Sequence, residues 1–202
     1  MNLESLRKEI LKLTSQYADL LLSPKEFTAG TDPVPVSGKV LTSDDFTSLV
    51  DSSLDGWLTA GRFTADFEKS LASFVGTRHA LFVNSGSSAN LVALSGLTSK
   101  KLGERALKPG DEVLTVAMGF PTTVNPIIQN GLKPVVVDVD LETLDVNVER
   151  LEEAVSSKTK AIMIAHTLGN PFDLDSVQRI CKENNLWLVE DSCDSLGSTY
   201  NG

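Results

Sequence analysis

Cysteine and histidine are scarce in this sequence, with two of each among 202 residues. Cys181 lies in a charged stretch with helical spacing and Cys193 in an acidic segment, so they form neither a disulfide framework nor the paired spacing of a zinc site. Their positions predict two free thiols and no metal centre within this chain. We therefore expect a protein of the reducing cytoplasm.

Basic residues are also few. The sequence has 18 Lys and Arg and 27 Asp and Glu, which gives a net charge of −9. A nucleic-acid groove or a surface for anionic membranes needs clustered Lys and Arg, so neither is expected as a partner. No apolar run reaches the roughly 20 residues that cross a bilayer, and the start at Met1 lacks the apolar core of a secretory signal. These absences again predict a cytoplasmic location.

The apolar content is sufficient for a folded core, at 41% hydrophobic and 22% charged residues. Apolar residues at spacings of three and four predict an amphipathic helix over residues 3–22. The Gly and Pro residues over 27–40 predict an extended connector. The chain is therefore expected to divide into an N-terminal segment, residues 1–40, and a globular domain, residues 41–202.

Beyond residue 43 the pattern alternates between helices and short strands rich in Val, Leu and Ile. Such alternation is typical of right-handed βαβ crossovers and a mostly parallel sheet, in which ligands bind at the carboxyl ends of the strands. The predicted fold class is therefore α/β. Helices are expected at residues 43–54, 64–75, 87–97, 121–130, 147–156 and 173–184, and strands at 79–84, 112–116, 134–139, 160–165 and 186–190.

The first motif follows the strand predicted at 79–84 and opens a helix. Gly86 permits close backbone approach, and the N–H groups and hydroxyls of Ser87 and Ser88 are suited to a phosphate. The glycine and lysine fingerprints of dinucleotide and P-loop sites are missing, which favours a single phosphate monoester. Taken alone, a strand-to-helix turn with a Ser N-cap explains the same residues more often.

The second motif is acidic and follows the strand predicted at 186–190. The carboxylate of Asp191 would face the same crevice as the phosphate loop, where it can keep a ring nitrogen protonated. Asp194 lies three residues further along the same turn. That both aspartates merely cap this turn is an equally good interpretation.

The third motif places Phe120 between Gly119 and Pro121, just past the strand predicted at 112–116. An aromatic ring at that rim can stack on a planar cofactor. An isolated Phe more often belongs to a core, so this hypothesis depends on the other two motifs.

The three motifs together resemble the DegT/DnrJ/EryC1/StrS family of sugar aminotransferases and dehydratases. The matching segments are NSGSSANLVAL, GFPTTVNPIIQNGLKPVVVDVDLETLDVN and VEDSCDSLG. The resemblance implies the large domain of the aspartate aminotransferase type, PLP fold type I. Because the chain stops at Gly202, where a further crossover is expected, we expect an N-terminal part that is incomplete at its C-terminus.

The resemblance also implies roles for single residues. Gly86 and Ser87, with Ser88, would bind the phosphate of pyridoxamine or pyridoxal 5'-phosphate. Phe120 would stack on the cofactor ring, and Asp191 would hold the pyridine nitrogen. Ring chemistry of this kind needs a protonated nitrogen, because only then does the ring accept electrons.

Asp194 separates two branches of the family. Aminotransferases have Gln or His at this place near the phenolic oxygen of the cofactor, whereas this chain resembles the pyridoxamine-phosphate-dependent, iron–sulfur 3-dehydratases. The implied reaction removes the C3 hydroxyl of a CDP-linked 4-dehydro-6-deoxy-D-glucose in the synthesis of 3,6-dideoxyhexoses for O-antigen lipopolysaccharide. Asp191 and Asp194 are the candidate catalytic residues.

For the full-length enzyme this branch implies a homodimer, a [2Fe–2S] cluster and an NADH-dependent iron–sulfur flavoprotein reductase. The cluster cysteines and the Lys or His at the cofactor lie downstream in the family, so Cys181 and Cys193 are not assigned as ligands. We expect the 202 residues alone to have weak or no turnover. Two alternatives stay open: a PLP-dependent nucleotide-sugar aminotransferase, and a noncatalytic remnant that associates with a full-length partner.

Overall fold

The computed structural model describes residues 2–35 and 37–202, and the chain divides into two compact units, Met1–Ala80 and Leu81–Gly202. The first unit is helical, and the second contains the sheet and all three predicted motifs. The segment boundary predicted at residue 40 lies inside the first unit. The domain organisation of the whole protein stays a prediction.

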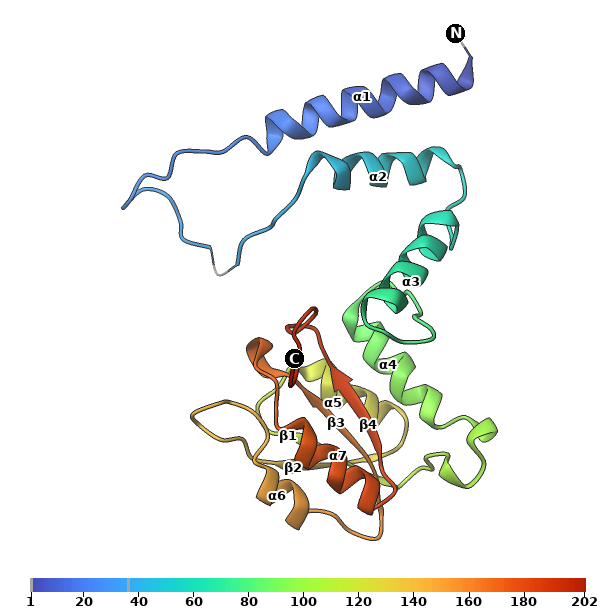
Figure 1. Cartoon of the computed structure of the whole chain (residues 1–202), viewed down its shortest axis with the longest axis vertical. Helices are drawn as coiled ribbons and strands as arrows, with labels where there is room; N and C mark the ends of the chain where they lie inside the picture. The colour runs from blue at the N-terminus through green and yellow to red at the C-terminus, as the bar shows by residue number, and fades with distance from the viewer. Residues whose placement is uncertain (1, 36) are drawn as a thin grey trace. The chain divides into compact units, whose positions relative to one another are not determined.

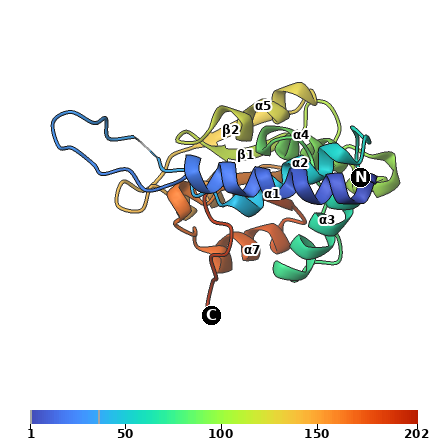
Figure 2. The same cartoon turned by 90° about the horizontal axis from the view of Figure 1, so that it is seen from above.

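The described part of the first unit contains three helices, α1 (Leu3–Leu21), α2 (Ser43–Leu54) and α3 (Arg62–Phe74). The Asn2 side chain caps α1 by accepting a hydrogen bond from Ser5 N at 2.8 Å. At the start of α2, the Asp45 carboxylate accepts one from Thr42 N at 2.7 Å. Figures 1 and 2 both show α1 and α2 side by side, and the two helices contact each other. The predicted helices at 3–22 and 43–54 are confirmed.

The connector between α1 and α2 contains neither helix nor strand among its described residues, as its Gly and Pro content predicted. Its residue 36 lies outside the described residues. Thr28 O accepts hydrogen bonds from Thr31 N and Asp32 N, and the Asp32 carboxylate accepts one from Thr28 N. The connector therefore satisfies part of its backbone through a local turn.

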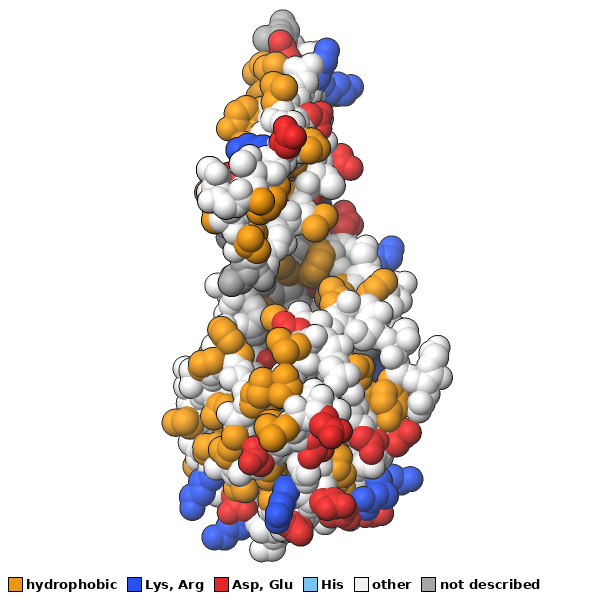
Figure 3. Space-filling view, turned by 90° about the vertical axis from the view of Figure 1, so that its left-hand side faces the viewer, with side chains coloured by type: hydrophobic (Ala, Val, Ile, Leu, Met, Phe, Trp, Pro, Cys, Tyr) orange, Lys and Arg blue, Asp and Glu red, His pale blue; other side chains and the backbone are white. Residues whose placement is uncertain are grey.

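The first unit leaves much apolar surface uncovered. Among the described residues of α1 only Ala18 is buried, while Leu13 and Tyr17 stay exposed, as does Leu49 of α2. Figure 3 shows orange side chains along these helices at the top of the view. Apolar burial alone therefore holds α1 and α2 together only in part.

Two arginines and two aspartates link the three helices of the first unit. Arg7 of α1 donates to Asp51 Oδ1 and to Asp55 Oδ1, both at 2.6 Å. Arg62 of α3 donates to Asp51 Oδ2 at 2.6 Å and to Asp55 Oδ2 at 2.9 Å. Hydrogen bonds from Arg62, and then from Arg7, lower the pKa of both carboxyls below the usual 3.8.

The second unit is a parallel α/β layer structure (Figure 1). Its four strands pair in the order β2-β1-β3-β4, and every pair is parallel. The predicted mostly parallel sheet with flanking helices is confirmed. The elements are α4 (Gly86–Leu97), η1 (Lys100–Arg105), β1 (Glu112–Val116), α5 (Pro121–Gln129), β2 (Lys133–Val137), α6 (Val148–Glu153), β3 (Thr159–Ala165), η2 (Thr167–Gly169), α7 (Leu174–Glu183) and β4 (Trp187–Asp191).

Alternate residues of the central strands enter two separate cores. Val113 of β1 and Met163 of β3 are fully buried on the face that packs with α4 and α5. Their neighbours Leu114 and Ile162 are fully buried on the opposite face, with α6 and α7. Because both faces are covered, successive residues are buried at 113–116 and 161–164, and all of these except Thr115 are apolar, as expected for parallel strands between two helix layers. This packing on both faces holds the strands in place, and with them the carboxyl ends that form one edge of the sheet.

The strand predicted at residues 79–84 is wrong, because the structure has no strand there. Leu81 is 70% exposed and Phe82 is 51% exposed. A strand needs a neighbouring strand for its backbone hydrogen bonds, and among the described residues this segment has none. Apolar residues alone therefore gave a false strand signal just before the phosphate motif. The other predicted helices and strands are confirmed, with ends that differ by a few residues.

Replacing Arg7 with Met is expected to loosen α1 from α2. The hydrogen bonds from Arg7 to Asp51 and Asp55 disappear, so hydrogen exchange of α1 amides at pH 7 should become several-fold faster. Because the pKa of both aspartates is lowered in the folded chain, their contribution is present above about pH 4 and is lost as the pH falls below the lowered values. In strong acid, the hydrogen-exchange rates of α1 amides in the wild type should therefore approach those of the Arg7 variant.

Lys8→Met is the matched control, because Lys8 lies beside Arg7 on α1 and pairs only with Glu4 on the same helix among the described residues. It should leave exchange of α1 unchanged. Equal protection in the Arg7 variant and the control would contradict the role given to Arg7.

Candidate functional site

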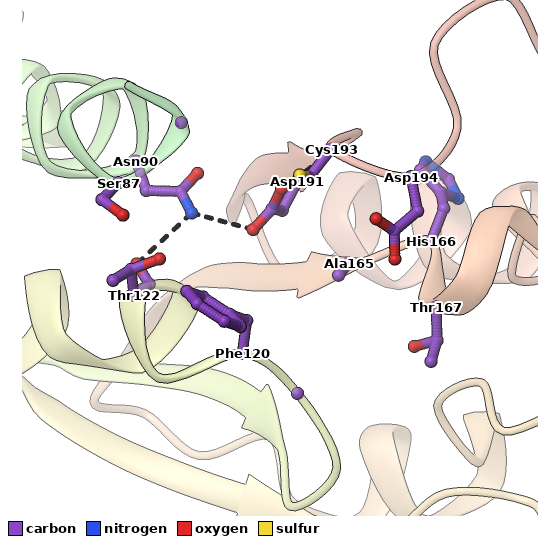
Figure 4. Close-up of a pocket in the computed structure, with 12 residues that line it drawn as sticks. Ser87, Asn90, Phe120, Thr122, Ala165, His166, Thr167, Asp191, Cys193 and Asp194 are labelled. Atoms are coloured by element: carbon purple, nitrogen blue, oxygen red, sulfur yellow. Dashed lines mark hydrogen bonds between the residues drawn. The ribbon is translucent and has the colours of Figure 1, made fainter. Parts of the chain in front are cut away.

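The carboxyl ends of β1, β3 and β4 and the starts of α4 and α5 enclose a cavity of about 350 Å³ in the second unit. Parallel strands place their carboxyl ends at one edge of the sheet, so all three predicted motifs meet there. Figure 4 shows the side chains around this cavity. The lining residues are Gly86, Ser87, Asn90, Gly119, Phe120, Thr122, Ala165, His166, Thr167, Asp191, Cys193 and Asp194.

Asp191 is the last residue of β4 and receives hydrogen bonds on both carboxylate oxygens. Its Oδ2 accepts from Asn90 Nδ2 and from Thr123 Oγ1, both at 2.8 Å. Its Oδ1 accepts from Cys193 N at 3.2 Å. Figure 4 shows the bond from Asn90 and the second bond that the same amide makes to Thr122. The carboxylate is therefore held by α4, α5 and its own turn.

The phosphate motif forms the start of α4. Ser85 is the N-cap, and its hydroxyl oxygen accepts a hydrogen bond from Ser88 N at 3.2 Å. Its carbonyl accepts from Ala89 N. The N–H groups of Gly86 and Ser87 precede the first intrahelical bonds, so they are the donors that remain for an anion. The N-cap interpretation and the phosphate interpretation of this motif are thus compatible.

Ser88 differs from the other two residues of its motif. It does not line the 350 Å³ cavity, and its N–H is occupied by the Ser85 cap. It borders a smaller hollow together with Ser87, Thr122 and Asn125. A helix turns each residue by about 100°, so Ser87 and Ser88 face different directions.

Phe120 is the N-cap residue of α5 and stands before Pro121, which starts the helix. Its side chain is 67% exposed and lines the cavity. The alternative that Phe120 belongs to the core is therefore wrong. An exposed ring at the cavity is available for stacking.

Asp194 lies in the turn after β4, exposed and at the cavity. Between the two aspartates, Cys193 also lines the cavity. Partial loss of hydration, followed by the negative charges of Asp194 and Asp191, raises the pKa of the Cys193 thiol, although Cys193 is an exposed residue. Burial likewise raises the pKa of Cys181 to about 11, so both cysteines are protonated thiols at neutral pH.

His166 follows β3 and is 6% exposed. Its ring stacks on Phe172 with centroids 4.3 Å apart, and its Nε2 lies 3.0 Å from Glu190 Oε2. Its Nδ1 has no hydrogen-bond partner among the described residues. His166 is therefore a packed residue of the cavity wall whose hydrogen bonding is satisfied at one nitrogen.

Sequence reasoning assigned no role to Asn90 and Thr123, the two side chains that hold Asp191. Asn90 is a polar residue within the otherwise apolar run from Ala89 to Leu94, and a buried amide needs a partner. That signal could have singled it out. Thr123 has no such signal, because Thr is common in the first turn of a helix.

In the described part of the chain, no group of three or more His, Cys, Asp or Glu side chains is arranged to hold a metal ion. None of its helices is long and apolar enough to cross a membrane.

Comparison with known proteins identifies a family over most of the chain. The model of the DegT/DnrJ/EryC1/StrS aminotransferase family matches residues 40–202. The lipopolysaccharide biosynthesis protein RfbH of Salmonella typhimurium is 60% identical over all 202 residues, which correspond to 46% of its length. The dTDP-4-dehydro-2,6-dideoxy-D-glucose 3-dehydratase of Saccharopolyspora spinosa is 56% identical over 87% of this chain and 38% of its own length.

A solved structure gives the same result for the fold. The GDP-4-keto-6-deoxy-D-mannose-3-dehydratase of E. coli with bound hydrated PLP superposes with a TM-score of 0.76 and 36% identity, over 83% of this chain and 43% of that one. The predicted aspartate aminotransferase-type fold, PLP fold type I, is confirmed. The chain spans less than half the length of these relatives.

Gly169 of η2 sets how closely the turn that carries Asp194 can approach. Its φ is +81°, and a Cβ at this position would lie 2.8 Å from the Asp194 carbonyl oxygen. Gly169→Ala is expected to lower the free energy of unfolding by about 2 kcal/mol beyond the cost of an alanine with a left-handed backbone. The additional loss arises because the Asp194 carbonyl must move. Urea unfolding measures this difference.

Gly110→Ala is the matched control, since Gly110 has a φ of +92° and open space where its Cβ would be. It should lose only the backbone contribution, about 1 kcal/mol. Equal losses in the two variants would show that the approach of the Asp194 turn is unimportant.

Proposed function

Because this chain belongs to the DegT/DnrJ/EryC1/StrS aminotransferase family, we propose that its cavity binds pyridoxamine or pyridoxal 5'-phosphate in a nucleotide-sugar 3-dehydratase. The observation that carries the proposal is the carboxylate of Asp191, held at the cavity by three hydrogen bonds. A carboxylate fixed in this way is suited to a pyridinium nitrogen.

The residues around the cavity fit such a cofactor at three points. Gly86 and Ser87 offer N–H groups and a hydroxyl at the start of α4, where the helix dipole favours an anion. Phe120 offers an exposed ring face, and Asp191 offers an acceptor for the ring N–H. A cavity of about 350 Å³ lies within the range of small-molecule sites. Figure 4 shows that these groups come from different elements and surround one space.

The cofactor, when bound, supplies an amine and an electron-accepting ring. Asp191 would keep the ring nitrogen protonated, and the exposed ring of Phe120 would stack on the cofactor. The N–H groups of Gly86 and Ser87 would bind the phosphate end. Asp194 lines the same cavity and adds a second carboxylate to its wall. The binding and orientation of the cofactor thus depend on this chain's own residues.

The dehydratase is favoured over the aminotransferase by the relatives, because the Saccharopolyspora and E. coli proteins are both named 3-dehydratases. We propose a nucleotide-linked 4-keto-6-deoxyhexose as substrate, with a CDP-linked sugar for lipopolysaccharide synthesis as the specific case, in keeping with the name of the Salmonella relative.

The residues of this chain do not fit an iron–sulfur cluster. A [2Fe–2S] centre takes four ligands, and the sequence has only Cys181 and Cys193. Cys181 is buried and Cys193 is exposed, and both thiols have a raised pKa. The cluster, the flavoprotein reductase and the homodimer are therefore proposed only for a full-length enzyme of this kind. We propose that the 202 residues alone bind the cofactor and have weak or no dehydratase turnover.

Asp191→Asn is expected to weaken the binding of pyridoxamine 5'-phosphate at least tenfold, because a neutral amide replaces the charged acceptor of the ring N–H. Titration of the 202-residue chain, followed by cofactor absorbance, measures this change.

Asp138→Asn is the matched control, since Asp138 also follows a strand of the sheet, is exposed and does not line the cavity. Its affinity should equal that of the wild type. If the two variants bind equally well, Asp191 does not hold the ring nitrogen.

A further inference from the structure

We infer that Asn90 and Thr123 are positioning residues, which occupy one oxygen of Asp191 and leave the other for the ring N–H of the cofactor. This inference rests on the proposed function, and it deepens it by naming what fixes the carboxylate. Neither residue was assigned a role by the family motifs in the sequence. Both side chains donate a hydrogen bond to Asp191, and of the two only Asn90 lines the cavity.

The hydrogen bonds divide unequally between the two oxygens of Asp191. Oδ2 receives both side-chain donors, at 2.8 Å each. A carboxylate oxygen has two lone-pair directions, so Oδ2 has no further capacity in the plane. Among the described residues, Oδ1 accepts only from Cys193 N, at 3.2 Å. One acceptor position on Oδ1 therefore remains for a ligand in the cavity.

The Asn90 amide can hold Asp191 in only one orientation. Its Nδ2 donates to Asp191 Oδ2 at 2.8 Å and to Thr122 O at 3.3 Å. A flipped amide would direct its oxygen at a carboxylate and a carbonyl, which both lack a proton to share. Asn90 is 9% exposed, so water cannot easily replace these bonds.

Thr123 links the carboxylate to the stacking residue. Its hydroxyl donates to Asp191, while its backbone N–H donates to Phe120 O at 3.0 Å. It is 2% exposed in the first turn of α5. Thr123 therefore fixes both Asp191, which is proposed to pair with the ring nitrogen, and the backbone of Phe120, whose side chain is proposed to stack on the ring. A hydroxyl at this position affects the relative placement of the two.

Thr123→Val and Asn90→Leu test the inference, because each removes the donor and keeps a similar volume. Pyridoxamine 5'-phosphate should bind each variant roughly tenfold more weakly, as expected for the loss of one charge-assisted hydrogen bond. The pH at which the bound cofactor loses its ring proton should fall by about one unit, because a loosened carboxylate stabilises the pyridinium less. Absorbance titrations over a range of pH give both readouts.

Thr123→Ser keeps the hydroxyl and should restore affinity and ring protonation to within about twofold of the wild type. Thr98→Val is the matched control, since the Thr98 hydroxyl donates to Ser95 O at 2.8 Å and lies outside the cavity. It removes a similar hydroxyl hydrogen bond, yet it should leave both readouts unchanged. Circular dichroism identifies any variant that fails to fold.

Three outcomes are decisive. Weaker binding with a lowered ring pKa in the folded valine variant, and recovery with serine, supports the inference. If the folded valine variant binds normally while Asp191→Asn binds weakly, the inference is overturned and the proposed function stands. If Asp191→Asn also binds normally, the proposed function itself fails.

Discussion

The parallel pairing of β3 with β4 is the constraint on which the candidate site depends. The register places Ala165 opposite Asp191 at the carboxyl end of the sheet. The His166 N–H then donates to Asp191 O at 3.2 Å, which extends the ladder one step beyond the strand. A slip of one residue would turn the Asp191 side chain to the opposite face of the sheet. The two cores prevent that slip, because it would also move Leu188 and Val189 of β4 into the wrong layers.

The helices and most strands could be predicted from the sequence, because the alternation of helices with short apolar segments is visible locally. Strands β1 and β3 are buried on both faces and consist mainly of consecutive apolar residues, which is the signal expected between two helix layers. The same reasoning failed at residues 79–84, where apolar residues occur without a neighbouring strand in the described chain. Strand formation depends on a partner far away in sequence, and composition carries no information about that partner.

The site shows the same division between local and distant information. Gly86, Ser87, Phe120, Asp191 and Asp194 were named from motifs, and the structure brings them to one cavity. Ser88 was grouped with them, but its backbone serves the Ser85 cap. Asn90 and Thr123 could not be assigned from the sequence, because each meets Asp191 across 101 and 68 residues of chain, respectively.

The central claim is that Asp191 pairs with the ring nitrogen of a bound pyridoxamine 5'-phosphate. Nitrogen NMR of the ring-¹⁵N-labelled cofactor, bound to the 202-residue chain, reports the protonation of that atom directly. We predict a protonated ring nitrogen in the wild type at a pH where the free cofactor has lost this proton, and an unprotonated one in Asp191→Asn. The same unprotonated signal in both proteins would contradict it.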